Sequence, residues 1–131
     1  TDFVGTNGIN GAKYSSAEQL ASKIDELWQK DLNEKFVVFT GGEPLLQLNK
    51  ELIDMLHSKN FKIAVETNGT IIPPENIDWI CVSPKKGAEF NLDYGNELKL
   101  VYPQNSINPS EFENFVVQPE FCHKSCKHLS L

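Results

Sequence analysis

Five strand-length apolar runs, each followed by a polar, glycine-containing or proline-containing segment, constrain the fold of this chain most. They are residues 35–40 (KFVVFT), 61–67 (FKIAVET), 79–83 (WICVS), 97–102 (ELKLVY) and 115–118 (FVVQ). Helical patterns alternate with the first runs, and no two-residue hairpin turn joins any two of them. Strands that are separated by helices and lack hairpins favour a parallel sheet of βα units. The chain is therefore predicted to be an α/β protein.

Two stretches have the periodicity of amphipathic helices. Ser15 and Glu18 match the Ser-x-x-Glu capping box. Apolar residues then follow at helical spacing, namely Leu20, Ile24, Leu27 and Trp28. This predicts a helix over residues 16–30. Leu48, Leu52, Met55 and Leu56 give a second helix one apolar face, and that helix is expected to end near Asn60.

Polar segments follow four of the predicted strands. They are Thr40-Gly41-Gly42-Glu43-Pro44, Glu66-Thr67-Asn68-Gly69, Ser83-Pro84-Lys85 and Gln118-Pro119. Two glycines let a backbone approach a ligand closely, although the first motif alone fits a tight turn equally well. The second and third segments alone are more typical of a common turn and a solvated strand exit. Because the carboxyl ends of parallel strands share one edge, where such sheets bind ligands, together they predict a binding site.

Length and charge limit the class of protein. The sequence has 131 residues, with 12 basic and 18 acidic side chains and a formal charge of −6, which fits one domain. The acidic balance argues against nucleic-acid or anionic-membrane partners. No apolar run approaches the roughly 20 residues that span a bilayer, and no signal-peptide pattern opens the chain. The sequence has only three cysteines, an odd number, which is unlike the disulfide framework of a secreted protein. We therefore expect a protein of the reducing cytoplasm.

The cysteines and histidines give a weaker metal signal. Cys122, His123, Cys126 and His128 lie close together, but a structural zinc site needs four ligands in paired spacing. Two apolar cysteines on the buried face of a terminal helix are favoured over zinc. Cys81 is predicted to be a core residue of a strand, and His57 to be a helix-dipole partner or a surface residue.

The motif Gly41-Gly42-Glu43-Pro44 resembles the methionine-contacting turn of the radical S-adenosylmethionine (SAM) superfamily. Longer segments resemble one family within it, the 7-carboxy-7-deazaguanine synthases, in the same order over nearly the whole chain. These segments are TDFVGTNGINGAKY (1–14), FTGGEPLLQ (39–47), VETNGT (65–70), DWICVSPK (78–85), GNELKLVYPQ (95–104) and FVVQP (115–119). The resemblance implies a small, incomplete (β/α) barrel, formed by one domain over residues 1–131 and usually assembled as a homodimer.

The resemblance also implies a lyase reaction of queuosine and 7-deazaguanine biosynthesis. In it, 6-carboxy-5,6,7,8-tetrahydropterin is contracted to 7-carboxy-7-deazaguanine with loss of ammonia. SAM, a [4Fe–4S] cluster and Mg²⁺ would be the cofactors, and flavodoxin or ferredoxin would be a suitable reductant. The radical abstraction needs no general acid or base, so no catalytic side chain is expected.

Site residues carry over position by position. Thr1 matches the threonine that ligates Mg²⁺, and Thr40 matches a substrate contact. Gly42 matches a backbone contact to SAM. The remaining matches to SAM-binding residues are Ser83, Pro84, Lys85, Gln118 and Pro119. Glu66 and Asn68 lie on the same predicted edge and are weaker candidates.

Three departures from the family pattern lead us to expect a longer protein. The family's three cluster cysteines precede the position of Thr1, and Cys81, Cys122 and Cys126 match other positions. An internal segment after Pro119 and a Gln-Thr-His-Lys tail after Leu131 are also absent from the sequence. Other interpretations remain open. They are another radical SAM enzyme such as a glycyl-radical activase, a non-catalytic SAM-binding module, and a zinc-stabilised interaction domain.

Overall fold

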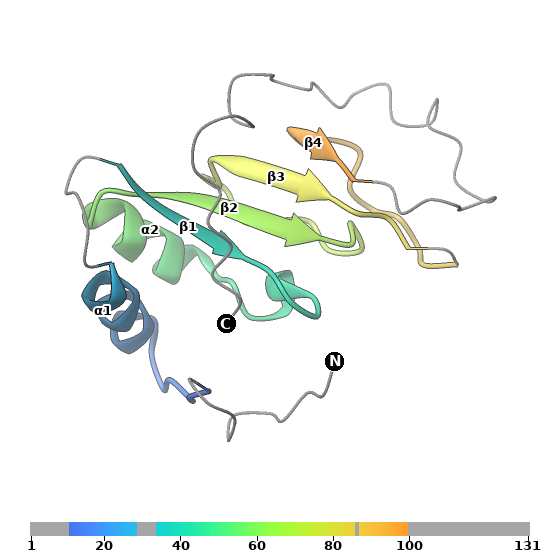
Figure 1. Ribbon diagram of the computed structural model, residues 1–131. Helices are drawn as coiled ribbons and strands as arrows, with labels where there is room; N and C mark the ends of the chain where they lie inside the picture. The colour runs from blue at the N-terminus through green and yellow to red at the C-terminus, as the bar shows by residue number, and fades with distance from the viewer. Residues whose placement is uncertain (1–10, 29–33, 86, 100–131) are drawn as a thin grey trace.

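Four parallel strands form the sheet in the computed structural model, which describes residues 11–28, 34–85 and 87–99. The strands lie in the order β1-β2-β3-β4 and all point the same way (Figure 1). Their bounds are β1 Lys35–Phe39, β2 Phe61–Thr67, β3 Trp79–Val82 and β4 Glu97–Leu98. The helices are α1 Ala17–Leu27, the 3-10 turn η2 Pro44–Leu46 and α2 Lys50–Ser58. The predicted parallel α/β fold is confirmed.

The predicted strands agree with the structure to within a residue at three positions. The exception is the run at 97–102, which pairs as a strand only at Glu97 and Leu98 in the described part of the chain. Residues from 100 onward, including the predicted strand at 115–118, lie outside the described residues.

The first helix begins one residue later than its capping pattern predicted. Ser16 is the N-cap, with an extended backbone at φ −149°, and its hydroxyl accepts a hydrogen bond from the Gln19 N–H at 3.2 Å. The Ser15 N–H and hydroxyl instead donate to Gln19 Oε1, at 3.1 and 2.9 Å. The prediction that Ser15 and Glu18 form the capping box is therefore wrong, because Ser16 and Gln19 occupy those two positions. α1 ends at Leu27, short of the predicted residue 30.

The second helix has both ends fixed by asparagines. The Asn49 side chain accepts from the Leu52 N–H at 2.9 Å and caps the first turn. Asn60 adopts a left-handed φ of +63°, and its N–H donates to the His57 carbonyl at 2.9 Å. Asparagine tolerates this conformation better than most residues, so the predicted end near Asn60 is confirmed.

The core lies between the two helices and one face of the sheet. Figure 1 shows α1 and α2 on the same side of the strands. Alternate residues of β2 face this side and are almost fully buried, as expected for side chains that alternate across a strand. The core consists of Ala21, Leu45, Leu48, Leu52, Ile53, Leu56, Phe61, Ile63, Val65, Ile80, Val82 and Leu92. No helix in the described part of the chain is long and apolar enough to cross a membrane.

Asp25 connects α1 to the amino-terminal end of the sheet. Its carboxylate accepts a hydrogen bond from the Lys35 ammonium in β1 and lies 3.5 Å from the Lys59 ammonium after α2. The hydrogen bond from Lys35 holds the pKa of Asp25 below its usual value. Lys35 also lies 5.1 Å from the Phe61 ring centre, and Trp28 meets that ring edge-on.

Asp78 makes a second connection at the same end of the sheet. Its Oδ2 accepts from the Ile63 N–H at 2.8 Å and lies 2.9 Å from His57 Nε2. The carboxylate therefore joins β2 to the last turn of α2. His57 is half-buried there, with a specific partner in addition to its place at the helix end.

Only one of the strand connections contains a helix in the described part of the chain. α2 links β1 to β2, whereas residues 68–78 link β2 to β3 without a helix. Pro73 and Pro74 lie in that segment, and proline lacks the N–H that a helix interior requires. The described part of the chain thus has fewer helices between its strands than a regular alternation of βα units would have.

Replacing Gly69 by alanine is expected to destabilise the protein more than replacing Gly87. Both glycines have a left-handed φ, of +80° and +78°, and this conformation costs alanine about 1–2 kcal/mol. A Cβ on Gly69 would also lie 2.4 Å from Phe90 Cε2, whereas a Cβ on Gly87 meets no atom within 4 Å. Urea unfolding of Gly69→Ala and Gly87→Ala measures the difference. Equal losses would show that Phe90 does not restrict Gly69.

Candidate functional site

The segments after β1, β2 and β3 gather at the carboxyl edge of the sheet. Figure 1 shows the three arrowheads at the same side. We call this edge the rim and define it as residues 40–43, 66–69 and 83–85 together with Lys99. Parallel pairing places these segments side by side, with Phe39 opposite Val65 and Thr67 opposite Val82. Seven of the predicted site residues that the structure describes lie here: Thr40, Gly42, Ser83, Pro84, Lys85 and the two weaker candidates, Glu66 and Asn68.

The register also decides which rim side chains lie on the face opposite the helices. Glu66 pairs with Cys81, and Cys81 pairs with Glu97. Paired residues in neighbouring strands project to the same face, and side chains alternate along each strand. Glu66, Cys81 and Glu97 therefore share one face, whereas Val65 and Val82 lie on the helix face. We call the face of Glu66 the open face. The sequence predicted the strand at residues 97–102, but not that Lys99 would lie beside Glu66 on this face.

A group of three polar side chains lies on the open face at the rim. The Thr40 hydroxyl donates to Glu66 Oε2 at 3.1 Å. The Lys99 ammonium lies 3.6 Å from the same oxygen. Thr40 and Lys99 are exposed and Glu66 is half-buried, and exposed ion pairs contribute little to stability. The main effect of the contacts is therefore to orient three polar side chains. Two-residue alternation from Glu97 could have identified Lys99 as a member of this group.

The Gly41-Gly42 backbone is open to approach from outside. Gly41 has φ +120°, which other residues rarely adopt. A Cβ built on either glycine would meet no atom within 4 Å. The backbone groups of this turn are thus accessible to a ligand at the rim.

The Glu43 side chain points back into the protein. Glu43 Oε1 accepts from the Thr67 hydroxyl at 2.8 Å and from the Leu45 N–H at 3.1 Å, and Oε2 accepts from the Asn68 N–H at 2.9 Å. This carboxylate therefore joins the turn after β1 to the turn after β2. The carboxylate is visible in the sequence motif, whereas these partners are not.

Ser83, Pro84 and Lys85 form the third segment of the rim. The Ser83 N–H donates to the Thr67 carbonyl at 2.8 Å, which continues the strand pairing. Pro84 is buried, and the exposed Lys85 ammonium donates to the Ser83 hydroxyl at 3.2 Å. One cation and one hydroxyl are thus presented together at the end of β3.

Cys81 is a buried thiol just below the rim, which confirms its assignment to the core. Burial, followed by the nearby carboxylates of Glu97 and Glu66, raises its pKa to about 12. A thiol with so high a pKa is a poor metal ligand, because metals bind the thiolate. Within the described ranges, no group of three or more histidine, cysteine or acidic residues could hold a metal ion.

The other predicted site residues lie outside the described residues. These are Thr1, Gln118 and Pro119, together with the metal candidates Cys122, His123, Cys126 and His128.

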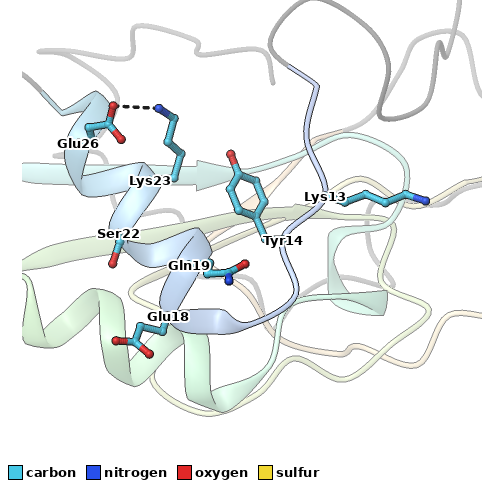
Figure 2. Close-up of a pocket in the computed structure, with 7 residues that line it drawn as sticks. All are labelled: Lys13, Tyr14, Glu18, Gln19, Ser22, Lys23 and Glu26. Atoms are coloured by element: carbon cyan, nitrogen blue, oxygen red, sulfur yellow. Dashed lines mark hydrogen bonds and ion pairs between the residues drawn. The ribbon is translucent and has the colours of Figure 1, made fainter.

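A surface hollow of about 560 Å³ is lined by residues that are not part of the rim. Figure 2 shows it along α1 and the segment before it, with Tyr14 beside the helix. Its lining is polar and of mixed charge: Lys13, Tyr14, Glu18, Gln19, Ser22, Lys23 and Glu26. None of these residues belongs to the rim, so the chemical groups of the rim and this hollow are separate features.

Known proteins that are similar to this chain identify its family. Residues 3–115 match the model of the radical SAM superfamily. A 7-carboxy-7-deazaguanine synthase from Bradyrhizobium diazoefficiens is 53% identical over 118 residues, which cover 90% of this chain and 56% of that protein. Enzymes of the same name from Bordetella pertussis and Caulobacter vibrioides are 49% and 50% identical over 124 residues, covering 91% of this chain and 59% of each. The chain thus spans somewhat more than half the length of these relatives, and the resemblance seen in its motifs is confirmed.

Cys81 is expected to resist alkylation in the folded protein. With a pKa near 12, its thiolate fraction at pH 9 is roughly a thousandth of the total, and burial also blocks access. Iodoacetamide at pH 9 followed by peptide mass mapping should leave Cys81 unmodified, whereas the same treatment in urea should modify it. Rapid modification without urea would contradict both the burial and the raised pKa.

Proposed function

The chain belongs to the radical SAM superfamily, and from this premise we propose that its rim binds SAM and that the full-length protein is a 7-carboxy-7-deazaguanine synthase. The observation that carries the proposal is the convergence of the open Gly41-Gly42 turn, the Thr40–Glu66–Lys99 group and the Ser83–Lys85 segment on one edge. These are the positions at which the chain resembles the synthases.

The described rim fits SAM. The Gly42 backbone is open, so it can contact the aminoacyl part of SAM. The Ser83 hydroxyl and the Lys85 ammonium offer a donor and a positive charge to its polar groups, and Pro84 fixes the backbone between them. When bound beside a reduced [4Fe–4S] cluster, SAM supplies a carbon-centred radical. Gln118 and Pro119 complete the proposed set of SAM contacts.

The described residues do not supply the cluster ligands. A [4Fe–4S] cluster is held by cysteine thiolates, and Cys81 is buried with a pKa raised to about 12. We propose that the cluster cysteines precede Thr1 in the full-length protein, as they do in the family that the sequence resembles. The proposed Mg²⁺ ligand is the Thr1 hydroxyl, an oxygen donor of the kind that Mg²⁺ prefers.

The substrate is proposed to contact the rim on the open face. 6-Carboxy-5,6,7,8-tetrahydropterin carries ring N–H donors and a carboxylate. Glu66 can accept hydrogen bonds from such donors, Thr40 can donate or accept, and the Lys99 ammonium complements negative charge. The existing contacts at 3.1 and 3.6 Å already hold these groups together, so little ordering is needed when the substrate binds.

The remaining proposals concern the whole protein. Residues 1–131 are proposed to form one radical SAM domain, supported by a superfamily match over residues 3–115. The full-length protein is proposed to be a cytoplasmic homodimer that receives electrons from flavodoxin or ferredoxin.

Turnover by the full-length protein tests the proposed function. Anaerobically reconstituted enzyme, supplied with dithionite, SAM and 6-carboxy-5,6,7,8-tetrahydropterin, should release 7-carboxy-7-deazaguanine and ammonia. Iron analysis of the same sample should give about four irons per chain. SAM cleavage without conversion of the carboxypterin would retain the superfamily and reject the synthase activity.

Two rim substitutions are expected to separate substrate binding from SAM binding. Thr40→Val removes one hydroxyl and should raise the KM for the carboxypterin about fivefold, the usual effect of one lost hydrogen bond. Lys85→Met removes a charge and should weaken SAM binding at least tenfold. Steady-state kinetics and equilibrium dialysis with SAM measure the two effects. If both variants changed the same constant, the proposed division of the rim would be wrong.

A further inference from the structure

We propose that Glu43 is a positioning residue for SAM, acting as a clamp that sets where the Gly42 backbone lies relative to the rest of the rim. The inference rests on the proposed function, since it assigns a role within the same binding site. In this role the carboxylate need not contact SAM. It acts through the two turns that it joins.

The Glu43 carboxylate is already occupied by protein donors. Both of its oxygens accept hydrogen bonds, three in all, from Thr67 Oγ1, Leu45 N and Asn68 N. A carboxylate has about four acceptor positions, and this side chain is half-buried. Most of its acceptor capacity is therefore directed into the protein. The adjoining Gly41-Gly42 backbone is the part of the turn that remains open.

Thr67 extends the clamp to the third segment of the rim. It is 2% exposed. Its hydroxyl donates to Glu43 and accepts from the Gly69 N–H at 3.1 Å, and its carbonyl accepts from the Ser83 N–H at 2.8 Å. One residue at the end of β2 thus connects the turn that carries Gly42 to the strand end that carries Ser83.

The position of the clamp explains why it matters for binding. Gly42 and Ser83 follow β1 and β3, two strands that do not pair with each other but lie on either side of β2. A ligand that contacts both must span the end of β2. Hydrogen bonds from Glu43 through Thr67 fix that span before the ligand arrives. Preorganisation of this kind improves affinity by lowering the entropy that is lost on binding.

Glu43→Gln tests the clamp, because an amide cannot accept all three bonds and turns an N–H₂ group toward one of the donors. In the full-length, cluster-loaded protein, we expect the Kd for SAM to rise about tenfold. The KM for SAM should rise while kcat at saturating SAM changes less than twofold. Thr67→Val should raise the Kd about fivefold, and Thr67→Ser, which keeps the hydroxyl, should restore it.

The matched control is Asp78→Asn. The Asp78 carboxylate also accepts a backbone hydrogen bond close to a strand, in this case from Ile63 in the amino-terminal half of β2. The Asp78→Asn variant should lower the melting temperature by an amount similar to Glu43→Gln, but should change the Kd for SAM less than twofold. An equal rise in Kd for Asp78→Asn would overturn the proposal, because general loss of stability would then explain the Glu43 result.

The Glu43–Thr67 pair distinguishes the clamp from a direct contact. If the clamp is correct, the double variant Glu43→Gln/Thr67→Val should bind SAM no more weakly than Glu43→Gln alone, since the two groups act as a unit. Weaker binding in Glu43→Gln with unchanged binding in Thr67→Val would instead assign Glu43 to the ligand and overturn the clamp.

Amide hydrogen exchange tests the clamp without any ligand. In SAM-free full-length protein, the Asn68 amide should exchange at least tenfold faster in Glu43→Gln than in the wild type, because its acceptor is weakened. Equal exchange would reject the clamp. If the wild type bound no SAM, the proposed function would fail, and Asn68 exchange would still decide whether Glu43 fixes this turn.

Discussion

Parallel pairing of the four strands is the constraint on which the rest of the structure depends. It brings every carboxyl end to one edge, so segments that are far apart in sequence become neighbours and can hydrogen-bond to one another. β2 connects the segments of the rim, because it pairs with both β1 and β3. Its last residue, Thr67, is the buried polar residue that the flanking turns share.

The two faces of the sheet have different roles. On the helix face, Ile63, Val65 and Val82 are fully buried against α1 and α2 and supply the core. At the amino-terminal end of the sheet, the carboxylates of Asp25 and Asp78 accept hydrogen bonds from Lys35 of β1 and Ile63 of β2. The open face carries Glu66, Cys81, Glu97 and Lys99. The core contacts are thus concentrated on one side of the sheet, whereas the polar side chains of the rim lie at its carboxyl end.

Much of this arrangement could be predicted from the sequence, because the positions of the strands and the polar segments that follow them are visible as local patterns. The run at residues 61–67 and the asparagine near the end of α2 were located correctly. The start of α1 was displaced by one residue, because Ser15 and Ser16 are chemically equivalent caps and only the backbone angles select one of them. The partners of Glu43 could not be predicted, since they depend on how closely two turns approach. Lys99 was missed because its charge becomes informative only when the register places it beside Glu66.

The Asn68-Gly69 turn also bears on how the protein ages. In a flexible chain, the nitrogen that follows asparagine attacks the side-chain amide, and the succinimide that results opens to aspartate or isoaspartate. A following glycine hinders this attack least. Here the Gly69 N–H is held by the Thr67 hydroxyl at 3.1 Å, and Asn68 Oδ1 accepts from the Thr70 N–H at 2.9 Å. The nucleophile and its target are both restrained, so the hydrogen bonds that order the rim also protect its most easily deamidated peptide from acquiring a new negative charge.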